Sequence, residues 1–345
     1  MKQIAAMKSM QYQPAWVRED FIDFIAEKIN PVWAWKKVKA TIIKRRVLSP
    51  DFYQLQLRPN RNFQHRQFKA GQSVLVTVEI AGVRHQRSYS VVKFLENGDI
   101  VIAVKQQGKV SNALTQRTFG SVVELSQTQG DFVLENETSP LLLIASGSGI
   151  TAIYSLLLEA LTDKSRPVDV IYFSRDEAFH AELEQLDQQH SQFNYHYIDT
   201  AQQKQHISAE LLSSLVPDFQ QRQSYVCGAS AMMQSTQQIF QDLMISNQLK
   251  QEYFQIAVDE SLAAQPVVFL RSQQEFAAKS SLLESAEQAG LKPTYGCRMG
   301  VCNTCTCTKV SGSTKNMLTG EVNHDANTQI KLCISQAISP VTINL

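Results

Sequence analysis

The sequence predicts a multidomain protein with three folded units: an antiparallel β-barrel, an α/β unit with a parallel sheet, and a small α+β unit. Short alternating strands separated by turns predict the barrel, and apolar strands alternating with helical segments from Leu141 predict the parallel sheet. The last unit contains a loop region with five of the six cysteines, between Cys297 and Cys333. A chain of 345 residues suits this number of units, because domains commonly contain about 100–150 residues.

The composition is that of an ordinary globular protein, with 43% apolar and 19% charged residues. A formal net charge of +1 argues against nucleic-acid binding by bulk electrostatics. The N-terminus lacks the apolar block and cleavage site of a secretory signal. The uncharged run from Leu141 to Leu158 contains glycines and hydroxyl residues, which are typical of a buried strand–turn–helix rather than a membrane helix. We therefore expect a cytoplasmic protein.

Residues 1–36 are expected to form a helical extension. Apolar residues recur at helical spacing until Asn30-Pro31 ends the pattern, and basic residues follow. Two interpretations stay open: peripheral contact of residues 1–36 with the inner face of the membrane, or a helix packed on the barrel with the basic residues solvated. The apolar residues are Val17, Phe21, Phe24, Ile25 and Ile29, with Trp16, Trp33 and Trp35, and the basic ones are Lys36, Lys37, Lys39, Lys44, Arg45 and Arg46.

Residues 37–138 are expected to form the barrel and residues 139–258 the α/β unit. The expected barrel strands are Lys39–Arg45, Tyr53–Leu57, Ser73–Ile80, Ile100–Val104 and Ser121–Leu125. The expected strands of the parallel sheet are Leu141–Ala145, Val168–Phe173 and Tyr225–Val226, and the helices between them are Ala152–Leu161, Phe179–Leu186 and Ala231–Asn247.

The last unit, residues 262–345, follows a linker near Asp259–Gln265. Its expected elements are a hairpin of Val267–Arg271 and Glu275–Ala278, a helix at Ser281–Gln288, the cysteine loop, and a final strand at Val341–Leu345.

The cysteine loop has the spacing of a plant-type [2Fe–2S] site. Cys297, Cys302 and Cys305 follow the pattern C-x4-C-x2-C, and Cys333 supplies a distant fourth thiolate. A structural zinc site is the alternative, although zinc sites with four cysteines usually show paired C-x2-C sequences. Cys307 is either a small side chain in the next strand or a ligand in exchange with Cys305, and the spacing favours Cys305.

Three short motifs in the expected barrel suit a flavin in combination, although each alone is weak. A guanidinium forms paired hydrogen bonds with a phosphate, a tyrosine packs on the ring system, and a serine hydroxyl hydrogen-bonds near the redox-active nitrogen. A glycine turn at a helix start can place backbone N–H groups against phosphates. The residues are Arg87, Ser88, Tyr89 and Ser90, then Gly108, Val110 and Ser111, then Gly130, Asp131 and Phe132.

The α/β unit contains two segments that suit a nicotinamide dinucleotide. Gly147 and Gly149 permit a pyrophosphate to approach the following helix, although Ala152 stands where the Rossmann motif has its third glycine. Cys227 and Gly228 follow a later strand, where the sulfur would lie near the nicotinamide and the glycine would leave room for the ring. The alternative for Cys227 is a buried core cysteine.

The strand that follows the first helix ends in Ser174 and Arg175. NAD-specific sites place an acidic residue at about this point, so an arginine favours the 2′-phosphate of NADPH. The alternative is an exposed arginine at a strand end, and the neighbouring Asp176 and Glu177 weaken the preference.

Together these residues resemble the ferredoxin–NADP reductase superfamily, in its branch with a plant-type ferredoxin domain at the C-terminus. The domain order resembles that of phthalate dioxygenase reductase-like proteins, and the N-terminal segment is similar to that of the electron-transfer partners of bacterial acyl desaturases. The resemblance covers about Val38 to Leu345. The family motifs fall on Arg87, Tyr89 and Ser90, on Gly108 and Ser111, on Gly147, Gly149 and Thr151, on Cys227 and Gly228, and on Cys297, Cys302, Cys305 and Cys333.

The resemblance implies an FAD-binding barrel, an NAD(P)-binding α/β domain and a β-grasp ferredoxin domain. It implies FAD, or alternatively FMN, a [2Fe–2S] cluster, and NADPH, or alternatively NADH. A hydride would pass from the nicotinamide to the flavin between Ser90 and Cys227, with Phe254 shielding the flavin ring, and single electrons would then pass to the cluster. The flavin is needed because the nicotinamide gives two electrons together and the cluster takes one.

The sequence has no His-rich box and no two-His carboxylate triad, so oxygen chemistry is expected on another protein. The expected partner is a terminal oxygenase or a membrane-bound desaturase or hydroxylase. The alternatives are a self-sufficient reductase of a small acceptor, such as a quinone or ferric chelate, and a flavin/Fe–S redox sensor.

Overall fold

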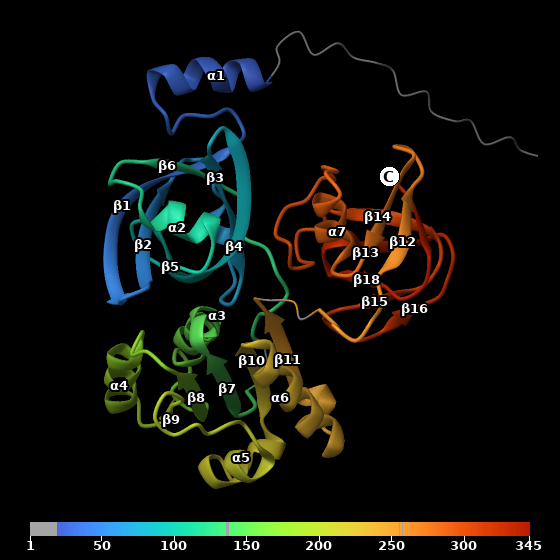
Figure 1. Cartoon of the computed structure of the whole chain (residues 1–345). Coiled ribbons are helices and arrows are strands. Elements are labelled where there is room, and N and C mark those ends of the chain that lie inside the picture. The colour runs from blue at the N-terminus through green and yellow to red at the C-terminus, as the bar shows by residue number, and fades with distance from the viewer. Residues whose placement is uncertain (1–18, 136–137, 255, 257) are drawn as a thin grey trace, which may run out of the picture.

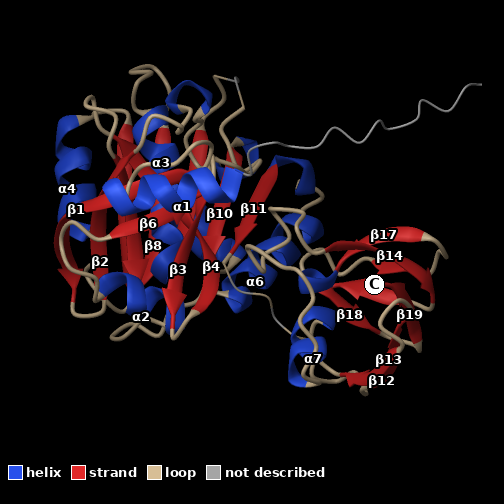
Figure 2. Cartoon of the chain, turned by 90° about the horizontal axis from the view of Figure 1, so that it is seen from above, coloured by secondary structure: helices blue, strands red, loops and turns tan. Residues whose placement is uncertain are grey.

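The computed structural model describes residues 19–135, 138–254, 256 and 258–345. The β-barrel lies in the middle of Figure 1, the α/β domain below it, and the C-terminal domain beside both. Figure 2, from above, shows the C-terminal domain as a separate lobe. Trp16 and Val17, which we expected in the N-terminal helix, lie outside the described residues. The three expected fold types are confirmed.

The barrel closes in the order β1-β2-β5-β4-β3-β6 with antiparallel neighbours. Valine, isoleucine and leucine side chains fill its interior, as expected for alternating β-branched strands. Helix α2 (Lys109–Thr115) packs on β3, β4 and β5. The strands are β1 (Val38–Ser49), β2 (Phe52–Pro59), β3 (Ser73–Ile80), β4 (Val83–Phe94), β5 (Ile100–Lys105) and β6 (Val122–Leu125).

The α/β domain has a parallel sheet in the order β11-β10-β7-β8-β9. Alternate strand residues face opposite sides, so one apolar layer packs under α3 and α4 and a second under α5 and α6. The strands are β7 (Leu141–Ser146), β8 (Val168–Ser174), β9 (Phe193–Asp199), β10 (Gln223–Gly228) and β11 (Leu249–Tyr253), and the helices are α3 (Ile150–Ala160), α4 (His180–Gln189), α5 (Ala209–Leu215) and α6 (Ser230–Asp242).

The barrel and the α/β domain share an apolar interface. Phe52 and Val92 of the barrel belong to the same buried cluster as Tyr154 of α3 and Phe179. The rings of Phe52 and Phe179 pack edge to face, with centroids 6.0 Å apart. This interface places α3 against the barrel strand β4 and brings the end of β11 to the same region (Figure 1).

The C-terminal domain is a mixed sheet in the order β13-β12-β19-β14-β17, with β12 parallel to β19, and a smaller sheet β16-β15-β18. Helix α7 (Leu282–Gln288), capped by the Ser281 hydroxyl, packs on the main sheet, which gives the β-grasp arrangement. The strands are β12 (Gln265–Phe269), β13 (Gln274–Ala278), β14 (Thr306–Ser311), β15 (Thr314–Asn316), β16 (Val322–Asn323), β17 (Thr328–Lys331), β18 (Ser335–Ala337) and β19 (Val341–Asn344).

Helix α1 (Glu19–Ile29) contacts the rest of the protein through its acidic side. The Asp23 side chain is buried, and its Oδ1 accepts a hydrogen bond from the backbone N–H of Trp35 at 2.6 Å. Lys37 Nζ lies 3.6 Å from Asp23 Oδ2, and Glu27 forms an ion pair with Lys39 of β1. The expected solvation of Lys39 was therefore wrong, because this lysine is buried under the helix.

The apolar side of α1 faces outward, in the reverse of the usual arrangement for a surface helix. Phe21, Phe24, Ile25 and Ile29 are 45–70% exposed, and Trp33 and Trp35 in the following loop are also more than half exposed. Figure 1 shows the helix across the end of the barrel that is remote from the α/β domain. No helix among the described residues combines the length and apolar character needed to cross a membrane.

Candidate functional site

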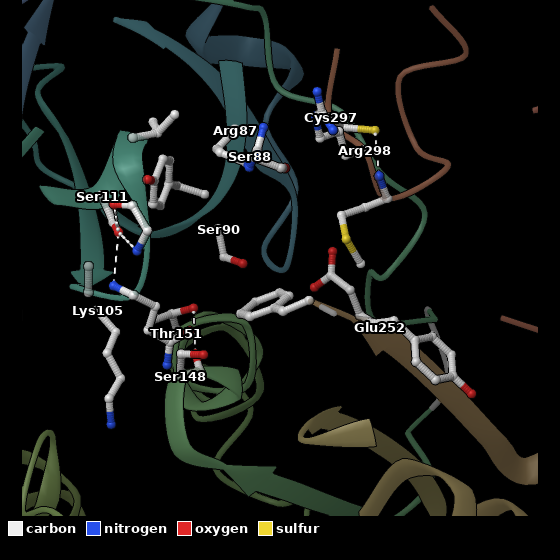
Figure 3. Close-up of a pocket in the computed structure, with 18 of the residues that line it drawn as sticks. Arg87, Ser88, Ser90, Lys105, Ser111, Ser148, Thr151, Glu252, Cys297 and Arg298 are labelled. Carbon is white, nitrogen blue, oxygen red and sulfur yellow. Dashed lines mark hydrogen bonds between the residues drawn. The ribbon is translucent and has the colours of Figure 1, made fainter. Parts of the chain in front are cut away.

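One cavity of about 400 Å³ lies where the three domains meet. Figure 3 shows Arg87 and Ser88 of β4 at the top of the cavity, with Cys297 and Arg298 of the C-terminal domain next to them. Ser148 and Thr151 of the α/β domain lie below, and Glu252 lies on the lower right. Seven of the lining residues are those we expected to bind a flavin: Arg87, Ser88, Tyr89, Ser90, Gly108, Val110 and Ser111.

Strand β4 brings Arg87, Tyr89 and Ser90 to the cavity because it pairs with β3 on one side and β5 on the other. The Ser90 hydroxyl is buried and has no hydrogen-bond partner among the described residues. Burial raises the pKa of Tyr89, so the phenol stays neutral. Burial, and then the neighbouring Arg298, lowers the pKa of Arg87. A buried hydroxyl and a half-buried cation that has no carboxylate partner among the described residues suit a polar, anionic ligand.

The turn at Gly108–Ser111 uses its serine to shape itself. Ser111 Oγ accepts hydrogen bonds from the backbone N–H groups of Gln107 and Gly108, both at 3.0 Å. Val110 is buried behind the turn. The hydroxyl of Ser111 therefore holds the loop, and the loop residues line the cavity.

The glycines after β7 have different roles. Gly147 has a φ of 51°, which favours glycine, and the space at its Cα is open. A Cβ on Gly149 would lie 2.1 Å from the carbonyl oxygen of Cys227, so this glycine is required for close packing of the turn against β10. Thr151 lines the cavity, and its hydroxyl donates to the carbonyl of Ser148 at 3.0 Å.

Cys227 is fully buried, and neither it nor Gly228 lines the cavity. Its neighbour across the parallel pair β10–β11 is Glu252. Burial, with Glu252 as the second cause, raises the pKa of the Cys227 thiol well above its ordinary value. The thiol is therefore neutral, in a layer directly behind the cavity wall.

Glu252 was not identified from the sequence. Burial raises the pKa of its carboxyl to about 8, and Oε2 has no hydrogen-bond partner among the described residues. It lines the cavity beside Phe254, which we did expect there. Its strand β11 is too polar to be recognised from the sequence, so no local signal indicated that this carboxyl is buried.

The expected dinucleotide-specificity residues lie after β8. Ser174 is buried, and its Oγ accepts a hydrogen bond from the backbone N–H of Asp176 at 3.2 Å. Arg175 is exposed. Asp176 is paired with Lys105 of β5 at 2.6 Å. These residues do not line the cavity that contains the flavin motif, apart from Lys105.

The four expected cluster cysteines lie together in two pairs. A hydrogen bond from the Cys297 thiol lowers the pKa of Cys302 to about 4, and a hydrogen bond from Cys333 lowers that of Cys305 to about 7. The backbone N–H of Met299 and that of Cys302 both donate to Cys297 Sγ at 3.3 Å. Among the described residues no group of three or more His, Cys, Asp or Glu side chains is arranged to hold a metal ion. The four thiols have the residue type and spacing of a plant-type [2Fe–2S] site.

Cys307 lies in β14 opposite Ile330 of β17, in the domain core. Burial raises the pKa of its thiol to about 12. A neutral, buried thiol in a strand agrees with the interpretation of Cys307 as a small core side chain.

Three domain families match the chain in succession. Residues 39–134 match the oxidoreductase FAD-binding domain, residues 143–238 the oxidoreductase NAD-binding domain, and residues 268–337 the 2Fe-2S iron–sulfur cluster binding domain.

Three curated relatives are similar over most of their length. An NADPH oxidoreductase of Mycobacterium tuberculosis is 27% identical, over 92% of this chain and 86% of its own. A tetrachlorobenzoquinone reductase of Sphingobium chlorophenolicum is 26% identical, over 90% of this chain and 98% of its own.

The third relative is the reductase subunit of a glycine betaine monooxygenase of Chromohalobacter salexigens, 24% identical over 80% of this chain and 87% of its own. The fold is also that of phthalate dioxygenase reductase, with a TM-score of 0.62, 23% identity, and coverage of 90% of this chain and 98% of the other. The chain is therefore an NAD(P)H-dependent flavin oxidoreductase with its own [2Fe–2S] domain. It belongs to the group whose FAD-binding, NAD-binding and 2Fe-2S domains follow one another as in phthalate dioxygenase reductase.

Proposed function

We propose that this reductase takes electrons from NADPH and supplies them through FAD and its [2Fe–2S] cluster to a terminal oxygenase or a membrane-bound desaturase or hydroxylase. One observation carries the proposal: a single cavity is lined by the flavin motif, by Thr151 and Phe254 from the nicotinamide side, and by Cys297 of the cluster loop. Donor, carrier and cluster can therefore be close enough together for electron transfer without a diffusing intermediate.

The cavity fits a flavin by its polar groups. In this assignment Arg87 binds the phosphates, Tyr89 packs on the ring, and the Ser90 hydroxyl, which has no other partner, hydrogen-bonds to the ring. The Gly108–Ser111 loop offers backbone N–H groups. A bound flavin accepts two electrons as a hydride and releases them one at a time.

On the nicotinamide side, Gly147 and Gly149 would border the dinucleotide, and Thr151 and Phe254 face the ring site. Gly228 would permit the close approach of β10 to Ser146, because a Cβ there would lie 2.2 Å from the Ser146 hydroxyl. Cys227 acts from the second layer as a neutral thiol, while Ser90 acts from the flavin side. Phe254 would cover the flavin ring and exclude water until the nicotinamide arrives.

The cluster ligands are Cys297, Cys302, Cys305 and Cys333. They would hold the cluster as thiolates, three from the loop and the fourth from Cys333, and the cluster would accept one electron at a time.

The donor is NADPH, because exposed Arg175 is available for a 2′-phosphate and the charge of Asp176 is compensated by Lys105. Buried Ser174 would support the turn rather than touch the phosphate. Arg175→Ala should raise KM for NADPH at least tenfold more than KM for NADH. Equal effects on both would remove Arg175 from this role.

The decisive experiment is an anaerobic absorbance titration of the purified holoprotein with NADPH and then NADH. We expect the flavin band and the [2Fe–2S] shoulders to bleach with NADPH, followed by reoxidation on adding a candidate oxygenase or desaturase. Bleaching of the flavin alone would contradict the electron path. Rapid reoxidation by a soluble quinone or ferric chelate, with none by any protein acceptor, would favour the small-acceptor function instead. Negligible turnover with every acceptor would favour a sensor.

We further propose that α1 brings the reductase to a membrane, where a desaturase or hydroxylase would be reached. The apolar residues Phe24 and Ile29 face outward with Trp33 and Trp35, and aromatic residues of this kind prefer the membrane interface. The basic residues make a smaller contribution than expected, because Lys39 is paired with Glu27 and Arg46 with Glu182 of the α/β domain.

Cosedimentation with anionic phospholipid vesicles tests this second proposal. Phe24→Ser and Trp33→Ser should each reduce the bound fraction several-fold, while the control Val47→Ser, which removes an equally exposed apolar side chain from the barrel, should not. A wild-type protein that stays in the supernatant would contradict membrane docking.

A further inference from the structure

Arg298 connects the cluster loop to the flavin cavity. It follows Cys297 directly and lines the cavity, although it belongs to the C-terminal domain (Figure 3). Its φ of 62° lies in the left-handed region, which is unfavourable for a non-glycine residue. Residues held in such conformations cluster at active sites and ligand-binding segments.

The side chain of Arg298 is held from within its own domain. Nη1 donates to Glu287 Oε2 of α7 at 2.7 Å, and Nη2 forms a second hydrogen bond with the same carboxylate. The guanidinium lies over the ring of Tyr295, 3.9 Å from its centroid. Its Nε–H is also buried and has no partner among the described residues. The arginine is therefore fixed in position with a buried N–H donor still unused.

Arg87 of β4 lies beside Arg298, from the other domain. Its Nη1 donates a hydrogen bond to the carbonyl oxygen of Gln86 at 2.8 Å, and no ion pair joins it to a carboxylate within the described part of the chain. The two guanidinium groups repel each other, and this repulsion contributes to the lowered pKa of Arg87. Arg87, Arg298 and the Glu287 carboxylate together leave an excess positive charge at the interface between the two domains. A bound anion would compensate this charge.

We propose that Arg298 completes the binding site for the flavin's phosphate group, so that the cluster loop is a structural part of the flavin site. This inference rests on the proposed placement of the flavin beside Arg87. The phosphate would accept hydrogen bonds from Arg87 of the barrel and from Arg298 of the C-terminal domain. Because binding is reciprocal, flavin binding and docking of the cluster loop then stabilise each other equally.

The test uses full-length protein from which the flavin has been removed and the cluster retained. FAD, FMN and riboflavin are titrated in turn, and each Kd is measured from quenching of flavin fluorescence. Riboflavin contains the same ring without a phosphate, so it separates recognition of the phosphate from support of the ring. The variants are Arg298→Gln, Arg298→Lys and, as a matched control, Arg271→Gln, an exposed arginine of the same domain.

We expect Arg298→Gln to weaken FAD and FMN binding about ten- to hundredfold, as for loss of a charge-assisted hydrogen bond. Riboflavin binding should be unchanged, Arg298→Lys should recover part of the loss, and Arg271→Gln should match wild type. The visible [2Fe–2S] spectrum of each variant shows whether the cluster loop is still folded. If Arg298→Gln loses its cluster, the flavin affinities of Arg298→Lys provide the test.

Two results would overturn the proposal. Unchanged FAD and FMN affinity in Arg298→Gln would exclude a phosphate contact, and an equal loss for riboflavin would mean that the loop supports only the ring. If wild type binds none of the three flavins, the proposed flavin site itself has failed, which is a distinguishable outcome.

Discussion

Lys105 Nζ of β5 lies 2.6 Å from Oδ2 of Asp176, two residues after the end of β8. Both side chains are only 18% exposed, so this ion pair is less screened than a surface pair. It joins the FAD-binding barrel to the NAD-binding domain and compensates the acidic charge next to Arg175. In the sequence, Asp176 weakened the expectation of NADPH. In the structure its charge is compensated by Lys105 from another domain.

Lys105→Met should therefore weaken the proposed preference for NADPH. The freed carboxylate of Asp176 would attract Arg175 and repel a 2′-phosphate, so we expect the ratio of kcat/KM for NADPH to that for NADH to fall about tenfold. The double variant Lys105→Met/Asp176→Asn should restore the ratio. Steady-state kinetics with both dinucleotides measure it, and flavin content is checked because Lys105 also lines the cavity. An unchanged ratio in Lys105→Met would show that Asp176 does not influence the dinucleotide.

The buried carboxyl of Glu252 should make stability depend on pH. Its pKa is about 8 in the folded chain and 4.5 in the reference state, so the folded state holds the proton more tightly. The stabilisation is fully present below pH 4.5 and is lost as pH rises to about 8. Wild type should therefore lose more Tm between pH 6 and 9 than Glu252→Gln does. Parallel Tm curves for the two proteins would show that Glu252 is ionised in both states.

The two cysteines at the end of the loop should respond differently to mutation. Cys307→Ala should keep the [2Fe–2S] absorbance, because this thiol is in the β14 core, whereas Cys305→Ala should abolish it. Iron content per chain and the visible spectrum measure the outcome. Retention of a full cluster in Cys305→Ala together with its loss in Cys307→Ala would exchange the two assignments.

Substitutions on the polar side of helix α1 should loosen its attachment to the barrel, whereas substitutions on its exposed apolar side should not. Asp23→Ala leaves the Trp35 N–H and Lys37 without their buried acceptor, so hydrogen exchange of the α1 amides should accelerate roughly tenfold or more. Phe24→Ser should change exchange little, because Phe24 is 54% exposed. A larger effect of Phe24→Ser than of Asp23→Ala would mean that the helix packs through its apolar face in solution.

Much of the fold could be predicted because local patterns agree with it. The strand Ser73–Ile80 was located at its observed limits, and the helix at Ser281–Gln288 differs from α7 only by its capping residue. Apolar alternation and helix caps are local signals that survive in the folded state. β4, β9 and β11 were not recognised as strands, because their sequences are interrupted by polar or charged residues whose partners lie on other strands.

At the functional site too, some residues could be identified from local sequence patterns and others only from the structure. The motifs around Arg87, Gly147 and Cys297 were recognisable because each ligand chemistry needs particular residue types at a fixed spacing. Glu252 was missed, because a single carboxyl is remarkable only once its burial is known. The outward-facing apolar side of α1 was also not predictable, since helical periodicity identifies an apolar face without saying which side is covered.

The sequence by itself determined the three domain types, their order, and the three cofactor chemistries, because short-range spacing specifies these. Only the tertiary structure decided that Arg298 lies beside Arg87, that Lys105 compensates Asp176, and that Asp23 rather than Phe24 anchors α1. These relationships join residues far apart in the chain. They depend on how separately folded domains pack, and no local pattern contains that information.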